Sequence, residues 1–94
     1  MRNHKPRFSL GQTVATPGAL QALDNAQETA MELIARHQSG DWGEVPPEDA
    51  ATNEHSLEFG LRLLSAYTLS SEVKVWIITE ADRSVTTILL PSEY

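Results

Sequence analysis

Two apolar, β-branched stretches near the C-terminus form the most hydrophobic part of the chain. They cover residues 73–79 (VKVWIIT) and 85–90 (VTTILL), and the short polar segment 80–84 (EADRS) lies between them. Two such runs joined by a brief polar link are typical of an antiparallel β-hairpin. The pattern therefore predicts a central hairpin that the rest of the chain extends or packs against.

Two further strands are expected outside this hairpin. Residues 8–16 have the β-branched character of a short edge strand, and Gly11 within them predicts a bulge or a close approach of backbones. Residues 62–69 form the second, and a short serine link joins them to the hairpin.

Three helix starts precede these last strands. Thr16 and Pro17 supply a hydroxyl N-cap followed by proline at the first helical position, which predicts a helix over 17–25. Thr29 and Glu32 have the spacing of a capping box, so a second helix begins there. Pro47 opens a third helix, which Gly60 is expected to end. The expected inward positions are Leu20 and Leu23 in the first helix, Ala30, Leu33, Ile34 and His37 in the second, and Ala50, Ala51, Leu57 and Leu61 in the third.

The order of these elements is β-α-α-α-β-β-β, with helices grouped before an antiparallel meander. Such an order predicts an α+β fold whose helices pack on one face of a four-stranded, mainly antiparallel sheet. We expect one domain over residues 8–94, preceded by a flexible basic tail over residues 1–7.

Apolar side chains on both faces of the hairpin suggest a second buried surface. An antiparallel sheet with one face in water alternates more regularly than these strands do. Either the N-terminal segment covers the second face, or a partner or second copy does so. In the latter case we expect Trp76 and Ile88 to take part.

The charge balance limits the kinds of partner. Thirteen acidic residues face seven basic ones, giving a net charge of −6, and Arg2, Lys5 and Arg7 lie in the first seven residues. An acidic body does not favour direct nucleic-acid binding, which needs clustered cations. It is compatible with a basic protein surface as partner, or with acidity that serves solubility alone.

Cysteine content and hydropathy further limit the chemistry and the cellular location expected for the protein. The chain has no cysteine, which excludes disulfides and thiolate chemistry. No apolar run approaches the roughly 20 residues needed to cross a bilayer. A cytoplasmic protein without a cofactor is the resulting expectation.

One pair of residues offers a catalytic alternative. His37 and Asp41 lie four positions apart, a spacing compatible with a base and its carboxylate in a small hydrolase or nuclease. Gly40 interrupts the helix between them, and His37 lies on the apolar stripe. A hydrogen-bonded core histidine is therefore the favoured interpretation, and we predict no catalytic, cofactor-binding or metal-binding residue.

The remaining candidates are contact residues. Trp42, between Asp41 and Gly43, is either an aromatic anchor for a partner or a plug that folds the loop onto the core. Polar residues at the hairpin tip suit a turn and a loose ion pair better than acid–base work. The candidate partner-binding set is Asp41, Trp42, Trp76, Glu80, Asp82 and Arg83.

Three stretches of the sequence resemble those of a known group of proteins. They are LGQTVATPGAL at 10–20, ARHQSGDWG at 35–43 and WIITEADRSVTTILLPSEY at 76–94. With them, the chain resembles a family of short bacterial "plasmid-related" proteins on mobile elements, some of which are labelled type I restriction endonuclease subunit M. The chain is too short for a methyltransferase domain and lacks a glycine-rich cofactor loop. What the resemblance implies is a mobile-element setting, without an activity or a catalytic residue.

Together these features predict a non-enzymatic interaction module. Its most specific form is an inhibitor of a host defence nuclease of the restriction or CRISPR type. The alternatives are the small hydrolase or nuclease based on His37 and Asp41, and a structural protein that self-associates into a homodimer.

Overall fold

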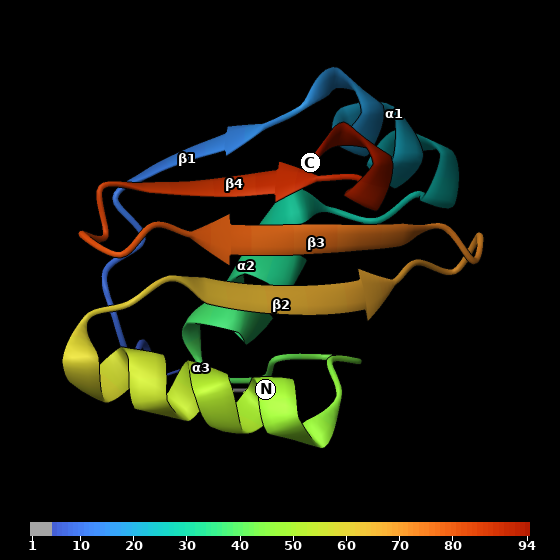
Figure 1. Cartoon of the computed structure of the whole chain (residues 1–94). Helices are drawn as coiled ribbons and strands as arrows, with labels where there is room; N and C mark the ends of the chain where they lie inside the picture. Colours follow the sequence, from blue (N-terminus) through green and yellow to red (C-terminus); the bar gives the residue numbers. More distant parts are fainter. Residues whose placement is uncertain (1–4) are drawn as a thin grey trace.

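A computed structural model describes residues 5–94, which fold into a four-stranded sheet with three helices and a short C-terminal 3-10 turn (Figure 1). The predicted α+β class and element order are confirmed. Most of the expected N-terminal tail, residues 1–4, lies outside the described residues. The elements are β1 (Gln12–Ala15), α1 (Pro17–Ala26), α2 (Ala30–Gln38), α3 (Pro47–Phe59), β2 (Leu63–Thr68), β3 (Lys74–Thr79), β4 (Val85–Leu89) and η1 (Pro91–Glu93).

The sheet has the strand order β1-β4-β3-β2. The predicted hairpin is confirmed, because β3 and β4 pair antiparallel and the Glu80 amide donates to the Val85 carbonyl at 3.0 Å. β2 pairs antiparallel with β3, whereas β1 pairs parallel with β4. The sheet is therefore mixed, and β1 is the edge strand that the sequence predicts.

β1 is shorter than the expected strand over 8–16. Gly11 precedes it with a φ of +64°, and a Cβ at this position would collide with the Ser84 carbonyl oxygen. The close backbone approach expected at Gly11 is thus present, and it explains the need for glycine there. Before Gly11 the chain leaves the sheet and runs toward α2.

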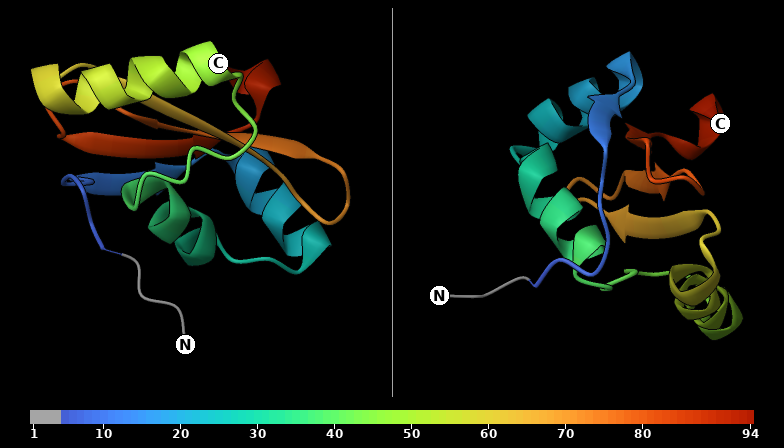
Figure 2. Two further views of the ribbon diagram at one scale, coloured as in Figure 1. Left: turned by 90° about the horizontal axis from the view of Figure 1, so that it is seen from below. Right: turned by 90° about the vertical axis from the view of Figure 1, so that its left-hand side faces the viewer.

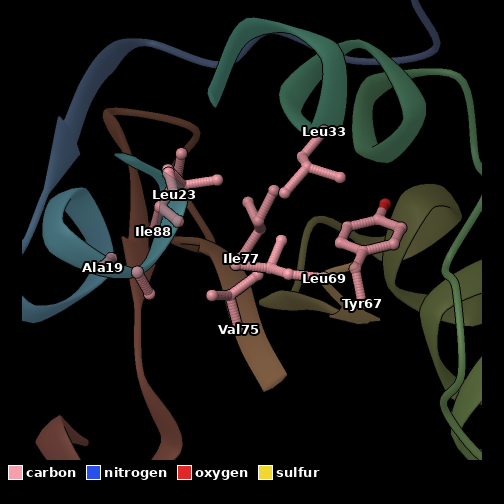
Figure 3. Close-up of a cluster of buried hydrophobic side chains, with 9 residues drawn as sticks. Ala19, Leu23, Leu33, Tyr67, Leu69, Val75, Ile77 and Ile88 are labelled. Atoms are coloured by element: carbon pink, nitrogen blue, oxygen red, sulfur yellow. The ribbon is translucent and has the colours of Figure 1, made fainter. Parts of the chain in front are cut away.

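α1 and α2 cover one face of the sheet and form the main core with it (Figure 3). In α1, Leu23 is buried as expected, but Leu20 is 55% exposed. The positions that face the sheet are Ala19, Ala22 and Leu23, a stripe of i, i+3 and i+4 that leaves position 20 outside. The buried cluster consists of Ala19, Ala22, Leu23, Leu33, Tyr67, Leu69, Val75, Ile77 and Ile88.

α3 lies apart from the other two helices. It runs beside β2, on the opposite side of the sheet from α1 and α2 (Figure 2), so the expectation that all helices share one face holds for two of them only. Its buried side chains are polar: Asn53 is 4% and Ser56 is 1% exposed. Of the positions expected to be inward, Ala51 and Leu61 are exposed, and Ala50 and Leu57 are half-buried.

The two residues expected to share a partner face lie on opposite faces of the sheet. Ile88 is paired with Ile77 and is 1% exposed, within the main core. Trp76 points to the other face, where the Tyr94 ring packs edge-on at 5.7 Å between centroids. The prediction of one partner surface that contains both Trp76 and Ile88 is therefore wrong. The described part of the N-terminal segment, from Lys5 on, does not cover that second face, because Phe8 packs near His37 instead.

No helix within residues 5–94 combines the length and the apolar character required to pass through a bilayer.

Candidate functional site

A chain of hydroxyl groups surrounds His37 inside the core. The imidazole Nδ1 lies 2.6 Å from the Ser65 hydroxyl, and Nε2 lies 2.9 Å from the Thr79 hydroxyl. Thr79 in turn lies 2.7 Å from the Thr86 hydroxyl. His37, Ser65, Thr79 and Thr86 are all fully buried. The network therefore links α2 to three strands without reaching solvent.

The last acceptor of this network, the Leu10 carbonyl, sets the direction of every hydrogen bond in the network. The Thr86 hydroxyl donates to the Leu10 carbonyl at 2.8 Å, so its oxygen accepts from Thr79. Because the Thr79 hydroxyl donates its hydrogen bond to Thr86, its oxygen accepts a hydrogen bond from His37 Nε2–H. Nδ1 then accepts from Ser65. A single neutral tautomer of His37 satisfies all partners.

The same surroundings oppose protonation of the ring. Burial, reinforced by the positive charge of Arg83, lowers the pKa of His37 to about 4. A base or metal ligand needs a ring nitrogen that a substrate or ion can reach. Both nitrogens of His37 are occupied, so His37 is the hydrogen-bonded core histidine that the sequence favours.

Asp41 engages other partners. Its carboxylate accepts from Arg36 Nε at 2.7 Å and from the Gly43 amide at 3.2 Å. Its carbonyl accepts from the Tyr67 hydroxyl at 2.5 Å, and Arg36 lies over the Tyr67 ring. Asp41 thus fixes the end of α2 and the following loop. Among residues 5–94, no three His, Asp or Glu side chains gather in a way that would hold a metal ion.

Trp42 fills the space between α2 and α3 as a plug. Its side chain is 6% exposed, and the indole N–H donates to Glu54 at 3.0 Å. Glu54 also accepts two hydrogen bonds from Arg7, at 2.8 and 3.0 Å. This bidentate pair lowers the pKa of Glu54. Arg7, which the sequence analysis places in the flexible tail, is therefore held in place.

The hairpin loop is tied to the body through Arg83. Its guanidinium donates to the Leu61 carbonyl at 2.6 Å and to the Ser56 carbonyl at 3.1 Å, at the end of α3. Asp82 accepts from the Ser84 amide at 3.0 Å. Hydrogen bonding by the Ser84 side chain, and then by its amide, lowers the pKa of Asp82. Arg62 lies 3.6 Å from Glu80. These contacts shape a turn, as the sequence suggests, and leave the carboxylates of Glu80 and Asp82 accessible to solvent.

Phe8 brings the two predicted loops to one end of the molecule. Its ring stacks on Trp42 with centroids 6.3 Å apart, and Arg83 lies 5.7 Å from its centroid. Trp76, the sixth candidate, lies on the far face of the sheet. Sequence reasoning missed Phe8 because a single aromatic after a basic stretch has no periodic pattern around it.

The surface charge is more one-sided than the composition suggests. All acidic side chains except Glu28 and Glu80 are exposed. In contrast, most described cations are used internally, which leaves only Lys5 and Lys74 without such a partner. The internal pairs are Arg7 with Glu54, Arg36 with Asp41, Arg62 with Glu80, and Arg83 with backbone carbonyls.

The two edges of the sheet also differ. At the β2 edge, Asn53 donates to the Leu64 carbonyl at 2.7 Å and accepts from the Leu64 amide at 3.1 Å. The Ala66 amide donates to Trp42 at 3.1 Å, and its carbonyl accepts from Glu44 at 2.7 Å. Within residues 5–94, β1 has no such cover on its outer edge. A missing cap of this kind cannot be read from sequence.

Comparison with family models, with curated proteins and with solved structures gave no match.

Proposed function

We propose that the protein is a non-enzymatic interaction module that binds a basic surface on another protein. Its partner is a nucleic-acid-binding protein of the cytoplasm, and the most specific form is inhibition of a host defence nuclease of the restriction or CRISPR type. The chain would occupy a cationic surface that normally holds DNA or RNA.

The observation that carries this proposal is the separation of charge. Three arginines pair with carboxylates of the chain and Arg83 pairs with backbone carbonyls, while all other acidic residues except Glu28 are exposed. An exposed acidic surface raises the rate of association with a basic partner and opposes binding to nucleic acid itself. The occupied ring nitrogens of His37 support contact rather than catalysis.

α3 is the part of this surface that is best placed for contact. It buries only Asn53 and Ser56, which leaves Glu48 and Glu58 exposed along the helix. The Arg83 contact with the Ser56 carbonyl places the hairpin loop next to the end of this helix. The resemblance to mobile-element proteins supports a defence nuclease as the partner to test first.

The experiment is a DNA-cleavage assay with a purified type I restriction endonuclease and a CRISPR nuclease, with and without this protein. We expect inhibition of one of them by the wild type and its loss in Glu48→Lys/Glu58→Lys. The control, Asp24→Lys/Glu72→Lys, makes the same change in net charge away from α3 and should still inhibit.

Two outcomes contradict the proposal. If the wild type inhibits neither nuclease and binds neither in pull-down, the nuclease partner is wrong. If both double variants lose binding equally, the effect is one of overall charge and α3 is not the contact.

A further inference from the structure

The edge of β1 is the one unpartnered edge of the sheet within residues 5–94. β1 pairs with β4 on one side, and the sheet order ends there. Exposed edge strands are usually blunted, because their free amides and carbonyls recruit other strands. The β2 edge is covered by Asn53 and the Trp42–Glu44 segment, whereas β1 has only its short length of four residues to limit pairing.

The hydrogen bonds between β1 and β4 show which backbone amides and carbonyls of β1 point outward. The Gln12 amide donates to Ser84 at 2.9 Å, and the Thr16 amide donates to Ile88 at 3.0 Å. In a parallel pair, alternate residues direct both of their backbone groups to the same neighbour. Gln12 and Val14 therefore pair with β4, and Thr13 and Ala15 present their amides and carbonyls outward.

The surroundings of the edge are apolar and uncharged. β1 contains neither a charged residue nor a proline. An open hollow of about 140 Å³ runs beside it, lined by Thr13, Val14, Ala15, Ala30, Ile34 and Ile88. Val14 is 40% exposed, and Met31, next to Ala30 on α2, is 79% exposed. An apolar recess beside free backbone groups suits an added strand, whose side chains enter the recess.

We propose that this edge pairs with β1 of a second copy of the chain. In antiparallel register about a two-fold axis at Val14, Thr13 of each copy faces Ala15 of the other. The outward amides and carbonyls of these residues then match as two hydrogen-bonded pairs. The two Val14 side chains meet in the non-hydrogen-bonded position between them, where Cβ atoms come within about 4.5–5.5 Å.

Self-pairing is favoured over pairing with an unrelated strand because the edge is complementary to itself. A two-fold contact requires that the same patch donates and accepts in matching positions. Thr13 and Ala15 meet this requirement on either side of Val14. No charge in β1 opposes its own copy across the ladder, so the repulsion between two acidic molecules acts only at longer range.

The test is sedimentation of the full chain from micromolar to millimolar concentration. We expect the wild type to dimerise as concentration rises, and Val14→Lys and Val14→Glu each to remain monomeric. Each variant places two like charges side by side on the two-fold axis. An equimolar mixture of the two variants should dimerise again, because Lys then faces Glu.

The mixture separates loss of the interface from loss of folding, since misfolded variants would not recover on mixing. Phe59→Lys is the matched control: Phe59 is 60% exposed on α3, beyond the opposite edge of the sheet, and its replacement should leave the dimer intact. A wild type that stays monomeric throughout, or a mixture that stays monomeric, overturns the proposal. Neither result bears on nuclease binding, which depends on α3 rather than β1.

Discussion

At the scale of single residues, His37 shows how environment decides the role of a functional group. Its position on the apolar stripe of α2 is visible in the sequence, and so is the break at Gly40 that separates it from Asp41. The hydroxyls of Ser65, Thr79 and Thr86 were visible only as scattered strand residues. Their alignment on one face, by strand pairing, is what fixes the neutral ring.

The buried ring predicts a pH-dependent stability. In the folded protein the pKa of His37 is about 4, against an ordinary value of 6.5 in the unfolded chain. Between these values the unfolded state binds the extra proton, so stability is fully present above the unfolded value and declines as pH falls. From about pH 7 to about pH 5.5, we expect a loss of about 1 kcal/mol.

Urea unfolding across that range measures the loss. Over this interval most carboxylates remain ionised, so His37 dominates the slope. His37→Gln should be less stable at neutral pH but should show a flatter profile, whereas His55→Gln, on the exposed surface of α3, should keep the wild-type slope. An unchanged slope in His37→Gln would show that another group is responsible.

At the scale of elements, α3 is attached by polar rather than apolar contacts. Asn53 matches both backbone groups of Leu64 at the β2 edge, so one side chain both docks the helix and closes the edge. The helix boundaries were predictable, because Pro47 and Gly60 are local signals. Its docking was not, because the predicted inward positions assumed an apolar stripe that α3 does not have.

Replacing Asn53 by alanine should therefore loosen the β2 edge. Asn53→Ala leaves the Leu64 amide and carbonyl without their partner, and we expect a loss of about 1–3 kcal/mol in the free energy of unfolding. Hydrogen exchange at the Leu64 amide should accelerate in parallel. Thr52→Ala, one position away and exposed, should change stability by less than about 0.5 kcal/mol. Equal effects of the two changes would contradict the capping role of Asn53.

At the scale of the whole molecule, local signals were reliable and long-range pairing was not. The capped helices and the hairpin follow from short spacings, and they occur close to where the sequence places them. The parallel pairing of β1 with β4 joins segments about seventy residues apart, and no local pattern encodes it. The same limit applies to the site: each candidate was named, but Phe8, which brings Trp42 and Arg83 together, was missed.

The two proposed contacts should respond to salt in opposite directions. Two copies of a chain with net charge −6 repel each other, and the proposed β1 ladder contains no ion pair to offset this. Raising the ionic strength shortens the screening length, which is roughly 10 Å at 0.1 M, so the dimer should become several-fold tighter. Binding of the acidic surface to a basic nuclease should weaken over the same range, because salt screens the attraction.

Sedimentation and a binding titration at low and high salt would measure both. Val14→Lys should abolish dimerisation at both salt concentrations and leave the salt dependence of nuclease binding. Glu48→Lys/Glu58→Lys should reduce nuclease binding and leave dimerisation in place. This crossed pattern is expected only if the sheet edge and α3 act as separate surfaces. If one variant removed both activities, the two contacts would share a surface, and the division of the molecule into an uncharged edge and an acidic helix would be wrong.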